Sequence, residues 1–292
     1  MLRIHLIDGT YELFRCFYGS PSKVTSTGSE VGATVTFVRS MLRLLQEDKA
    51  THIACAFDHV ITSFRNSLFD GYKTGENIDS LILSQFELIE RATEAIGVTY
   101  WPMIEFEADD ALASAARKLS ANPNVSQILI CTPDKDLAQC VKEQRVVCFD
   151  RRKGVIIDEA GVSSKYGIYP ESIPDWLALV GDRSDGIPGI SGWGKKSAAT
   201  ILFHYKHLEQ IPKRPDELVV QVRGAQRLIQ NLYNNWKSAQ LYRELATLRT
   251  DVQLDVKLKK IKWKGVPKTL FKELCLELEE LDLLKLVKNW VE

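Results

Sequence analysis

Three short apolar runs in the first half of the chain end in an aspartate or just before one. Asp8 closes the run that begins at Leu2, Asp58 closes the run 52–57, and Asp134 follows the run 127–131. Because these runs are short, partly β-branched and followed by turn or helix signals, they are typical of buried parallel strands. Ligands of open α/β sheets bind beyond the carboxyl ends of the strands. The pattern therefore predicts an α/β fold with a mainly parallel sheet and three carboxylates at one edge.

More acidic residues crowd around two of these positions. Glu107, Asp109 and Asp110 lie within four residues, and Asp136 follows Asp134 at i+2. Neighbouring anions repel one another, and a bound cation is the usual remedy. Oxygen ligands without paired histidine or cysteine favour Mg²⁺ or Mn²⁺ over zinc. A lone aspartate more often caps a helix or faces solvent, so the metal prediction depends on the grouping.

Composition sets broad limits on the class of protein. The chain has 292 residues, 45% of them hydrophobic and 26% charged, which is ordinary for one large or two modest globular domains. It opens directly into an expected strand, and no apolar run approaches about 18 residues. We therefore expect a cytoplasmic protein without a membrane partner. Six cysteines without CxxC pairing indicate free thiols. The net charge of zero still allows a DNA partner, because an acidic metal cluster would offset basic residues elsewhere.

The character of the chain changes near Tyr169-Pro170. Before that point, expected strands alternate with amphipathic helices such as 31–46 and 78–96, and a helix over 108–119 begins with acids. After it, helix-like segments dominate. We therefore predict an α/β domain over residues 1–170 and a helical region over 171–292.

A glycine-rich segment lies in the second part. Gly189 and Gly194-Lys195 have P-loop spacing, but Lys196 stands where a serine or threonine would bind Mg²⁺, and Pro188 precedes the segment where a strand should be. A turn between two helices, with free N–H groups that hold a nucleic-acid phosphate, explains the segment better. The alternative is a purely structural interhelical turn, which the segment taken alone slightly favours.

Several motifs then occur in one order along the chain. They are Ile7-Asp8-Gly9 with Arg15, Phe57-Asp58, Ser63-Phe64-Arg65, Gly71-Tyr72-Lys73, Phe106-Glu107-Ala108-Asp109-Asp110, Asp134-Lys135-Asp136-Leu137, Gly181-Asp182 with Ser184-Asp185, and Gly192-Trp193-Gly194-Lys195-Lys196-Ser197-Ala198. This succession resembles the 5′-nuclease domain of bacterial DNA polymerase I, within the 5′-3′ exonuclease and flap endonuclease family. The resemblance covers essentially the whole chain.

The resemblance implies a PIN-like α/β core with a helical arch at about 62–96, and a helix-three-turn-helix at about 175–206 that grips duplex DNA. It implies a first metal group of Asp8, Asp58, Glu107 and Asp109 with Asp110 close by, and a second group of Asp134, Asp136, Asp182 and Asp185. Two Mg²⁺ ions roughly 4 Å apart, or Mn²⁺ in their place, would clamp the scissile phosphate.

The resemblance also implies DNA contacts. Lys73 and Arg65 would reach the phosphate from the arch and neutralise charge in the transition state. Tyr72 could stack on an unpaired base, or could simply be a packed aromatic. The remaining expected contacts are Arg15, Gly189, Gly192, Gly194, Lys195, Lys196 and Ser197. K⁺ binding at the helix-three-turn-helix is a further expectation.

Three positions depart from the family pattern. Glu76 stands where the arch usually has a second basic residue, Gly186 replaces an asparagine, and Trp193 replaces an aliphatic residue. The leading hypothesis is a free-standing, monomeric, Mg²⁺-dependent 5′-nuclease acting on DNA flaps, nicks or 5′ ends in replication and repair. Glu76 favours the first alternative, a weakly active or non-catalytic flap-binding paralogue, whereas the complete set of acids opposes it. The long DNA-gripping half speaks against the second alternative, a ribonuclease.

Overall fold

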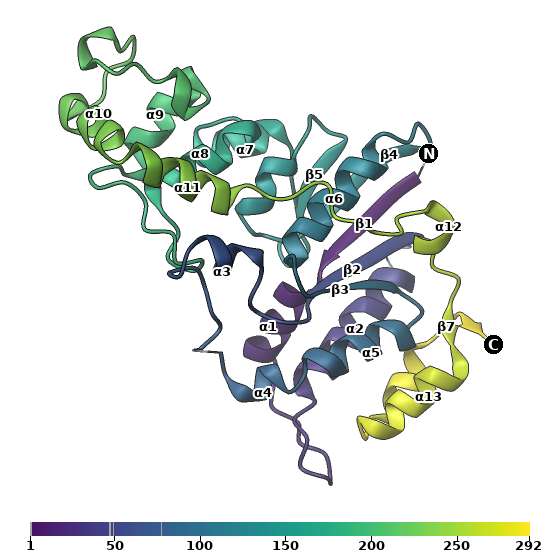
Figure 1. Ribbon diagram of the computed structural model, residues 1–292. Helices are drawn as coiled ribbons and strands as arrows, with labels where there is room; N and C mark the ends of the chain where they lie inside the picture. The colour runs from purple at the N-terminus through teal and green to yellow at the C-terminus, as the bar shows by residue number, and fades with distance from the viewer. Residues whose placement is uncertain (1, 47, 49, 77) are drawn as a thin grey trace. The chain divides into compact units, whose positions relative to one another are not determined.

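The computed structural model describes residues 2–46, 48, 50–76 and 78–292 (Figure 1). The chain forms two compact units, each assembled from separated stretches of sequence. Unit 1 comprises Met1–Ile61, Gly75–Thr132 and Thr250–Glu292, and unit 2 comprises Thr62–Thr74 and Pro133–Arg249. Strands alternate with helices in the first half of the chain, and helices dominate later, which confirms the predicted α/β fold with a helical C-terminal part.

Unit 1 is built on four parallel strands in the order β3-β2-β1-β4. These strands are β1 (Leu2–Asp8), β2 (His52–Asp58), β3 (Thr99–Met103) and β4 (Val125–Cys131). In the two central pairings, Ile7 lies opposite both Cys55 and Cys131. Strands covered on both faces are apolar along their length, which is why the sequence of β2 shows a run of buried residues rather than an alternation.

Helices cover both faces of these four strands (Figure 1). On one face lie α1 (Gly9–Gly19), α2 (Gly32–Gln46) and α5 (Phe86–Ala95), and on the other lies α6 (Ala108–Ser120). The last stretch of the chain adds α12 (Leu258–Ile261), β7 (Val266–Pro267), α13 (Lys268–Glu277), the 3₁₀ segment η5 (Leu281–Leu286) and β8 (Trp290–Val291). Arg91 of α5 and Glu277 of α13 form a salt bridge of 2.6 Å.

The helix predicted over 78–96 is interrupted. A short helix α4 (Ser80–Leu83) precedes α5, and Asp79 caps it by accepting a hydrogen bond of 2.9 Å from the Leu81 N–H. The side chain of Gln85, at the junction, is buried and accepts hydrogen bonds from the N–H and hydroxyl of Thr34 at 3.1 and 3.0 Å. These polar contacts accompany the break, and a hydrophobic period in the sequence does not indicate them.

Unit 2 is mainly helical. Its helices are α3 (Phe64–Leu68), α7 (Glu159–Tyr166), α8 (Ile173–Val180), α9 (Lys195–Tyr205), α10 (Ala225–Asn234) and α11 (Trp236–Ala246). It also holds an antiparallel pair, β5 (Val146–Asp150) with β6 (Val155–Ile157), and the 3₁₀ segments η1 (Asp136–Cys140), η2 (Pro170–Ser172), η3 (Leu208–Gln210) and η4 (Pro215–Glu217). Helix α8 packs against α9 and α11, and its apolar side chains Leu177, Ala178 and Leu179 are fully buried.

The predicted division at residue 170 falls in η2, between α7 and α8, and stays a prediction. In the described structure none of the six cysteines forms a disulfide bond. None of the helices in the described ranges combines the length and the apolar character that a membrane crossing would require.

Candidate metal centre

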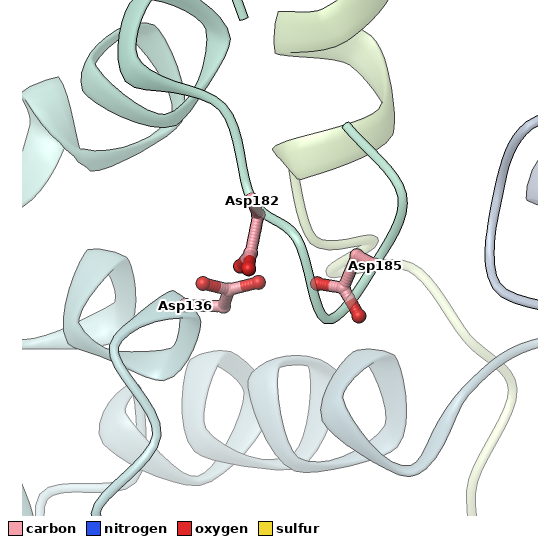
Figure 2. A group of neighbouring side chains, drawn as sticks. All are labelled: Asp136, Asp182 and Asp185. Carbon is pink, nitrogen blue, oxygen red and sulfur yellow. The ribbon is translucent and has the colours of Figure 1, made fainter. Parts of the chain in front are cut away.

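Three carboxylates of unit 2 gather at one place. Asp136, Asp182 and Asp185 each offer an oxygen, and these oxygens lie within 4.8 Å of one another (Figure 2). Asp136 begins η1, and the other two lie in the turn that follows α8. Asp136 and Asp182 are buried, with 7% of each residue exposed. Carboxylates this close, two of them buried, are stabilised by a nearby positive charge or by taking up a proton.

The turn after α8 has a conformation that its glycines permit. Gly181 ends the helix with φ +80°, and backbone hydrogen bonds of 2.8 Å in both directions join Asp182 to Ile187. Gly186 has φ +74°, and a Cβ atom there would lie 2.0 Å from the Gly71 carbonyl oxygen. Glycine is therefore needed at 186 for both reasons, which explains this departure from the family's asparagine.

The close approach at Gly186 brings Lys73 to the acidic group. The Lys73 N–H donates to the Asp185 carbonyl at 3.1 Å, and its Nζ lies 3.3 Å from Asp185 Oδ1. The Lys73 ammonium also lies 5.6 Å from the centre of the Tyr72 ring. Lys73 is thus a direct neighbour of the carboxylates through both its main chain and its side chain.

Lys135 lies inside the group, and sequence reasoning did not select it. Its Nζ forms a short ion pair with Asp182 Oδ2 and lies 3.6 Å from Asp136 Oδ1. Among the described residues, Asp136 Oδ1 accepts no hydrogen bond. Asp134 Oδ1 accepts the Asp136 N–H at 2.9 Å and so shapes the start of η1. The sequence did contain a signal for this role of Lys135, because the lysine lies between two aspartates that were predicted as metal ligands.

The protonation equilibria of this group differ between its members. Burial, reinforced by the charges of Asp134 and Asp185, raises the pKa of Asp136 well above its ordinary value. Burial acts in the same direction on Asp182, but hydrogen bonds from Lys135 and Ser184 outweigh it and lower the pKa of that carboxyl. Burial opposes the charged form of Lys135, and the surrounding aspartates overcome this and raise its pKa. Of the two buried carboxyls, Asp136 is therefore the one that the protein itself compensates less.

In unit 1, two predicted carboxylates lie at strand ends. Asp8 ends β1 and caps α1, with Oδ1 accepting the Tyr11 N–H and Oδ2 accepting the Thr132 hydroxyl, both at 2.9 Å. Asp58 ends β2, and its Oδ1 accepts the Ala108 N–H at 2.8 Å. The N-terminus of α6 is therefore held at the carboxyl end of β2, where it favours a negative charge.

The acids at the start of α6 play different parts. Glu107 and Asp110 form a reciprocal capping box, in which the Glu107 N–H donates to Asp110 Oδ2 at 3.0 Å. Both residues are buried, whereas Asp109 is partly exposed. Asp110 thus has a capping role that accounts for its acid, and its metal role stays a prediction.

Arg65 and Tyr72, predicted as DNA contacts, are buried. The Arg65 guanidinium donates to the carbonyls of Leu245 at 2.8 Å and Thr247 at 3.1 Å, and only 1% of the residue is exposed. Tyr72 is 4% exposed. This placement favours the packed alternative for Tyr72 and an anchoring role for Arg65, which ties α3 to the end of α11.

The glycine-rich turn precedes α9. The Gly194 N–H donates to Ser197 Oγ at 3.1 Å, and Lys195 and Lys196 are exposed on the first turn of the helix. Trp193 is buried and donates from Nε1 to the Leu228 carbonyl at 3.0 Å, so this departure from the family pattern packs against α10.

Three further predicted contacts have these surroundings. Gly189 has φ +74°, and a Cβ atom there would lie 2.6 Å from the Gly181 N. Gly192 has φ +88°. In unit 1, Arg15 Nε donates to buried Glu12 at 3.1 Å on the same helix. The DNA contacts of all three stay predictions.

A cleft of about 530 Å³ opens in unit 2. It is lined by Pro133, Asp134, Lys135, Lys165, Tyr166, Trp176 and Lys195. Three ammonium groups and two aromatic rings thus come from the start of η1, the end of α7, α8 and the start of α9. The Tyr166 and Trp176 rings pack at 5.8 Å, and Lys165 Nζ lies 4.9 Å from the Tyr166 ring centre.

Comparisons with known proteins agree with this architecture. The family model described as "5′-3′ exonuclease, N-terminal resolvase-like domain" matches residues 3–167. The model described as "5′-3′ exonuclease, C-terminal SAM fold" matches residues 168–269.

Curated relatives lead to the same family. A 5′-3′ exonuclease of Buchnera aphidicola is 34% identical over 259 residues, covering 88% of this chain and 85% of that protein. DNA polymerase I of Pseudomonas aeruginosa is 33% identical over 297 residues, covering 98% of this chain; the chain spans 31% of that polymerase.

Two solved structures share the fold. T5 5′-exonuclease with bound divalent metal ions (zinc) has a TM-score of 0.67 at 19% identity, over 95% of this chain and 100% of that one. The catalytic core of Rad2 in complex with DNA substrate has a TM-score of 0.63 at 14% identity, over 98% of this chain and 90% of that one. With both family models matching in sequence order and an exonuclease relative covered over most of its length, the chain belongs to the 5′-3′ exonuclease family of nucleases.

Proposed function

We propose that this chain is a Mg²⁺-dependent, structure-selective 5′-nuclease that hydrolyses DNA phosphodiesters at 5′ flaps, nicks or 5′ ends during replication and repair. The observation that carries the proposal is the close group of Asp136, Asp182 and Asp185, the first two of them buried, in a chain of this family. Its donors are carboxylate oxygens, the ligands that Mg²⁺ and Mn²⁺ prefer.

We assign a divalent-ion site to the carboxylates of each unit. In unit 1 the ligands would come from Asp8, Asp58, Glu107 and Asp109, and in unit 2 from Asp134, Asp136, Asp182 and Asp185. When bound, such ions lower the pKa of an attacking water and stabilise the leaving 3′-oxygen. No nucleophilic side chain is then required.

The other proposed roles belong to basic residues and to the turn. Lys73 is partly exposed beside Asp185, and its ammonium would neutralise charge on the scissile phosphate. Lys195 and Lys196 on the first turn of α9 would bind backbone phosphates, and the carbonyls of the preceding turn would hold K⁺. Arg65 would act by fixing α3, the helix that precedes Lys73.

The non-catalytic paralogue is the less favoured alternative. Its support is Glu76, which stands where the arch usually has a basic residue. Against it, all nine predicted acidic positions carry a carboxylate, and the family is one of nucleases. Glu76 would then tune rate or flap threading rather than abolish cleavage.

The test is cleavage of a 5′-labelled flap beside matched single-stranded and blunt duplex DNA, with Mg²⁺, Mn²⁺ or EDTA. We expect metal-dependent incision near the flap junction. Binding without cleavage in either metal would overturn the nuclease proposal. We also propose a monomer that acts in the cytoplasm, and light scattering at working concentrations would reveal any larger assembly.

A further inference from the structure

The ammonium of Lys135 lies where a divalent ion would have to bind the carboxylates. It forms an ion pair with Asp182 Oδ2 and lies 3.6 Å from Asp136 Oδ1. Both carboxylates are buried, and both belong to the group whose oxygens lie within 4.8 Å of one another (Figure 2). A cationic side chain thus lies against the same oxygens that the proposed function assigns to a divalent ion.

One ammonium compensates these carboxylates incompletely. Asp136 Oδ1 accepts no hydrogen bond among the described residues, even though Lys135 is near. A divalent ion carries twice the charge and can bind several carboxylates at once. Two cations cannot both contact Asp182 Oδ2 closely without strong repulsion. The lysine must therefore leave Asp182 when that oxygen takes a divalent ion.

The cleft provides a place for the released ammonium. Lys135 already lines the cleft. Lys165, near the end of α7, and Lys195, at the start of α9, line it too. In the described structure Lys165 and Lys195 are exposed, and the side chain of Lys135 is 30% exposed. Three ammonium groups around one cleft are suited to a phosphate of a DNA strand, which Lys binds as a point charge.

We propose that Lys135 is an exchangeable counter-ion: it neutralises Asp182 and Asp136 in the metal-free protein, and on metal binding it turns into the cleft to bind a DNA phosphate beside Lys165 and Lys195. This inference rests on the proposed function for the identity of its second ligand. Because binding linkage is reciprocal, metal then strengthens DNA binding, and DNA strengthens metal binding, through this side chain.

The first experiment measures metal affinity alone. Calorimetric titration of the full chain with Mn²⁺ compares wild type, Lys135→Met, Lys135→Arg and the control Lys153→Met, which removes an exposed lysine paired with Asp150 at 3.4 Å. Without its competitor, the Lys135→Met protein should bind Mn²⁺ about tenfold more tightly. Lys135→Arg and the control should stay within about twofold of wild type, because both keep the counter-ion charge. Unchanged or weaker binding by Lys135→Met overturns the exchange.

The second experiment measures DNA affinity without turnover. Fluorescence anisotropy with a flap DNA is recorded in Ca²⁺ and in EDTA, and a gel verifies that the DNA stays intact. In Ca²⁺, Lys135→Met should bind about three- to tenfold more weakly than wild type, the loss of one phosphate contact. In EDTA the two proteins should bind equally, because Asp182 holds the lysine. Equal losses in both conditions would contradict the exchange and indicate a fixed lysine.

The two arms separate this inference from the proposed function. Failure of wild type to bind flap DNA in either condition would sink the DNA role while leaving the Mn²⁺ result to decide the counter-ion role. Circular dichroism on each variant establishes that it is folded, and Lys135→Arg should retain the metal-dependent DNA affinity within about threefold.

Discussion

At the scale of single residues, the neighbours of each carboxyl group determine its pKa. Asp136 is buried, receives little compensation and has a raised pKa, whereas Asp182 is compensated by Lys135 and Ser184. The pKa values of two chemically identical carboxyl groups are therefore shifted in opposite directions by their neighbours. The less compensated one gains most from a bound cation.

Asp136→Asn tests this at the residue scale. Loss of the carboxylate should reduce flap cleavage in Mg²⁺ about a thousandfold or more, since metal stabilisation of the reacting oxygens is worth several kcal/mol. DNA affinity in EDTA should change little. Asp216→Asn, at a side chain 74% exposed, is the matched control. A fully active Asp136→Asn protein would remove this residue from the metal assignment.

The positions of several acidic residues in the fold could be predicted from the sequence, but their ion-pair and hydrogen-bond partners could not. Asp8 and Asp58 could be assigned to strand ends because an apolar run of strand length stops at each. The ion pair of Lys135 with Asp182 could not be predicted, because it depends on how η1 and the turn after α8 approach in space. The burial of Arg65 was missed for the same reason: its acceptors lie 180 and 182 residues further along the chain.

At the scale of elements, a buried guanidinium anchors α3. Helix α3 has only five residues, and a helix this short depends on tertiary contacts. Arg65 supplies them by bonding to carbonyls at the end of α11, while Arg65 Cζ lies 4.7 Å from the centre of the Phe64 ring.

Arg65→Met should therefore lower the free energy of unfolding by about 2–4 kcal/mol, because buried carbonyls lose charged donors. Urea denaturation measures this, with Arg214→Met, at a side chain 68% exposed, as the control. An unchanged midpoint together with a large loss of cleavage would instead indicate that Arg65 contacts the substrate phosphate.

A second anchor precedes α2. Burial opposes the charged form of Glu30, but hydrogen bonds from the Ser22 hydroxyl and from the N–H groups of Lys23 and Gly32 prevail, so the pKa of Glu30 is lowered. A carboxyl whose folded pKa is below its unfolded pKa stabilises the protein above the unfolded pKa. That contribution is lost as the pH falls through the folded pKa.

Glu30→Gln should consequently cost about 1–3 kcal/mol of unfolding free energy at pH 7 and progressively less as the pH falls from the unfolded pKa through the folded pKa. Thermal denaturation of both proteins across this range checks the sign. A difference that stays constant with pH would show that the charge of Glu30 does not contribute.

The whole molecule combines a net charge of zero with a proposed polyanionic ligand. Binding must then depend on where the charges lie. Lys195 and Lys196 are exposed together on the first turn of α9, where the helix dipole also favours an anion.

The double change Lys195→Met with Lys196→Met should weaken binding to all DNA sequences about equally. It should also reduce the slope of log affinity against log salt by about two, one for each lost phosphate contact. Anisotropy titrations in EDTA over a salt range of about 50 to 200 mM measure the slope. An unchanged slope would exclude these lysines from the DNA contact.

The discontinuous make-up of the two units has a consequence for synthesis on the ribosome. Unit 2 closes at Arg249, whereas unit 1 includes Thr250–Glu292. That last stretch is bonded into unit 1, for instance by Trp263 donating to the Ile96 carbonyl at 2.9 Å and the Val252 N–H donating to Ser114 Oγ at 3.0 Å. During synthesis from the N-terminus, every residue of unit 2 has therefore been made before residues 250–292 of unit 1. Unit 2 can fold completely while the parallel sheet of unit 1 still lacks this covering segment. The order of completion is the reverse of the order in which the two units begin.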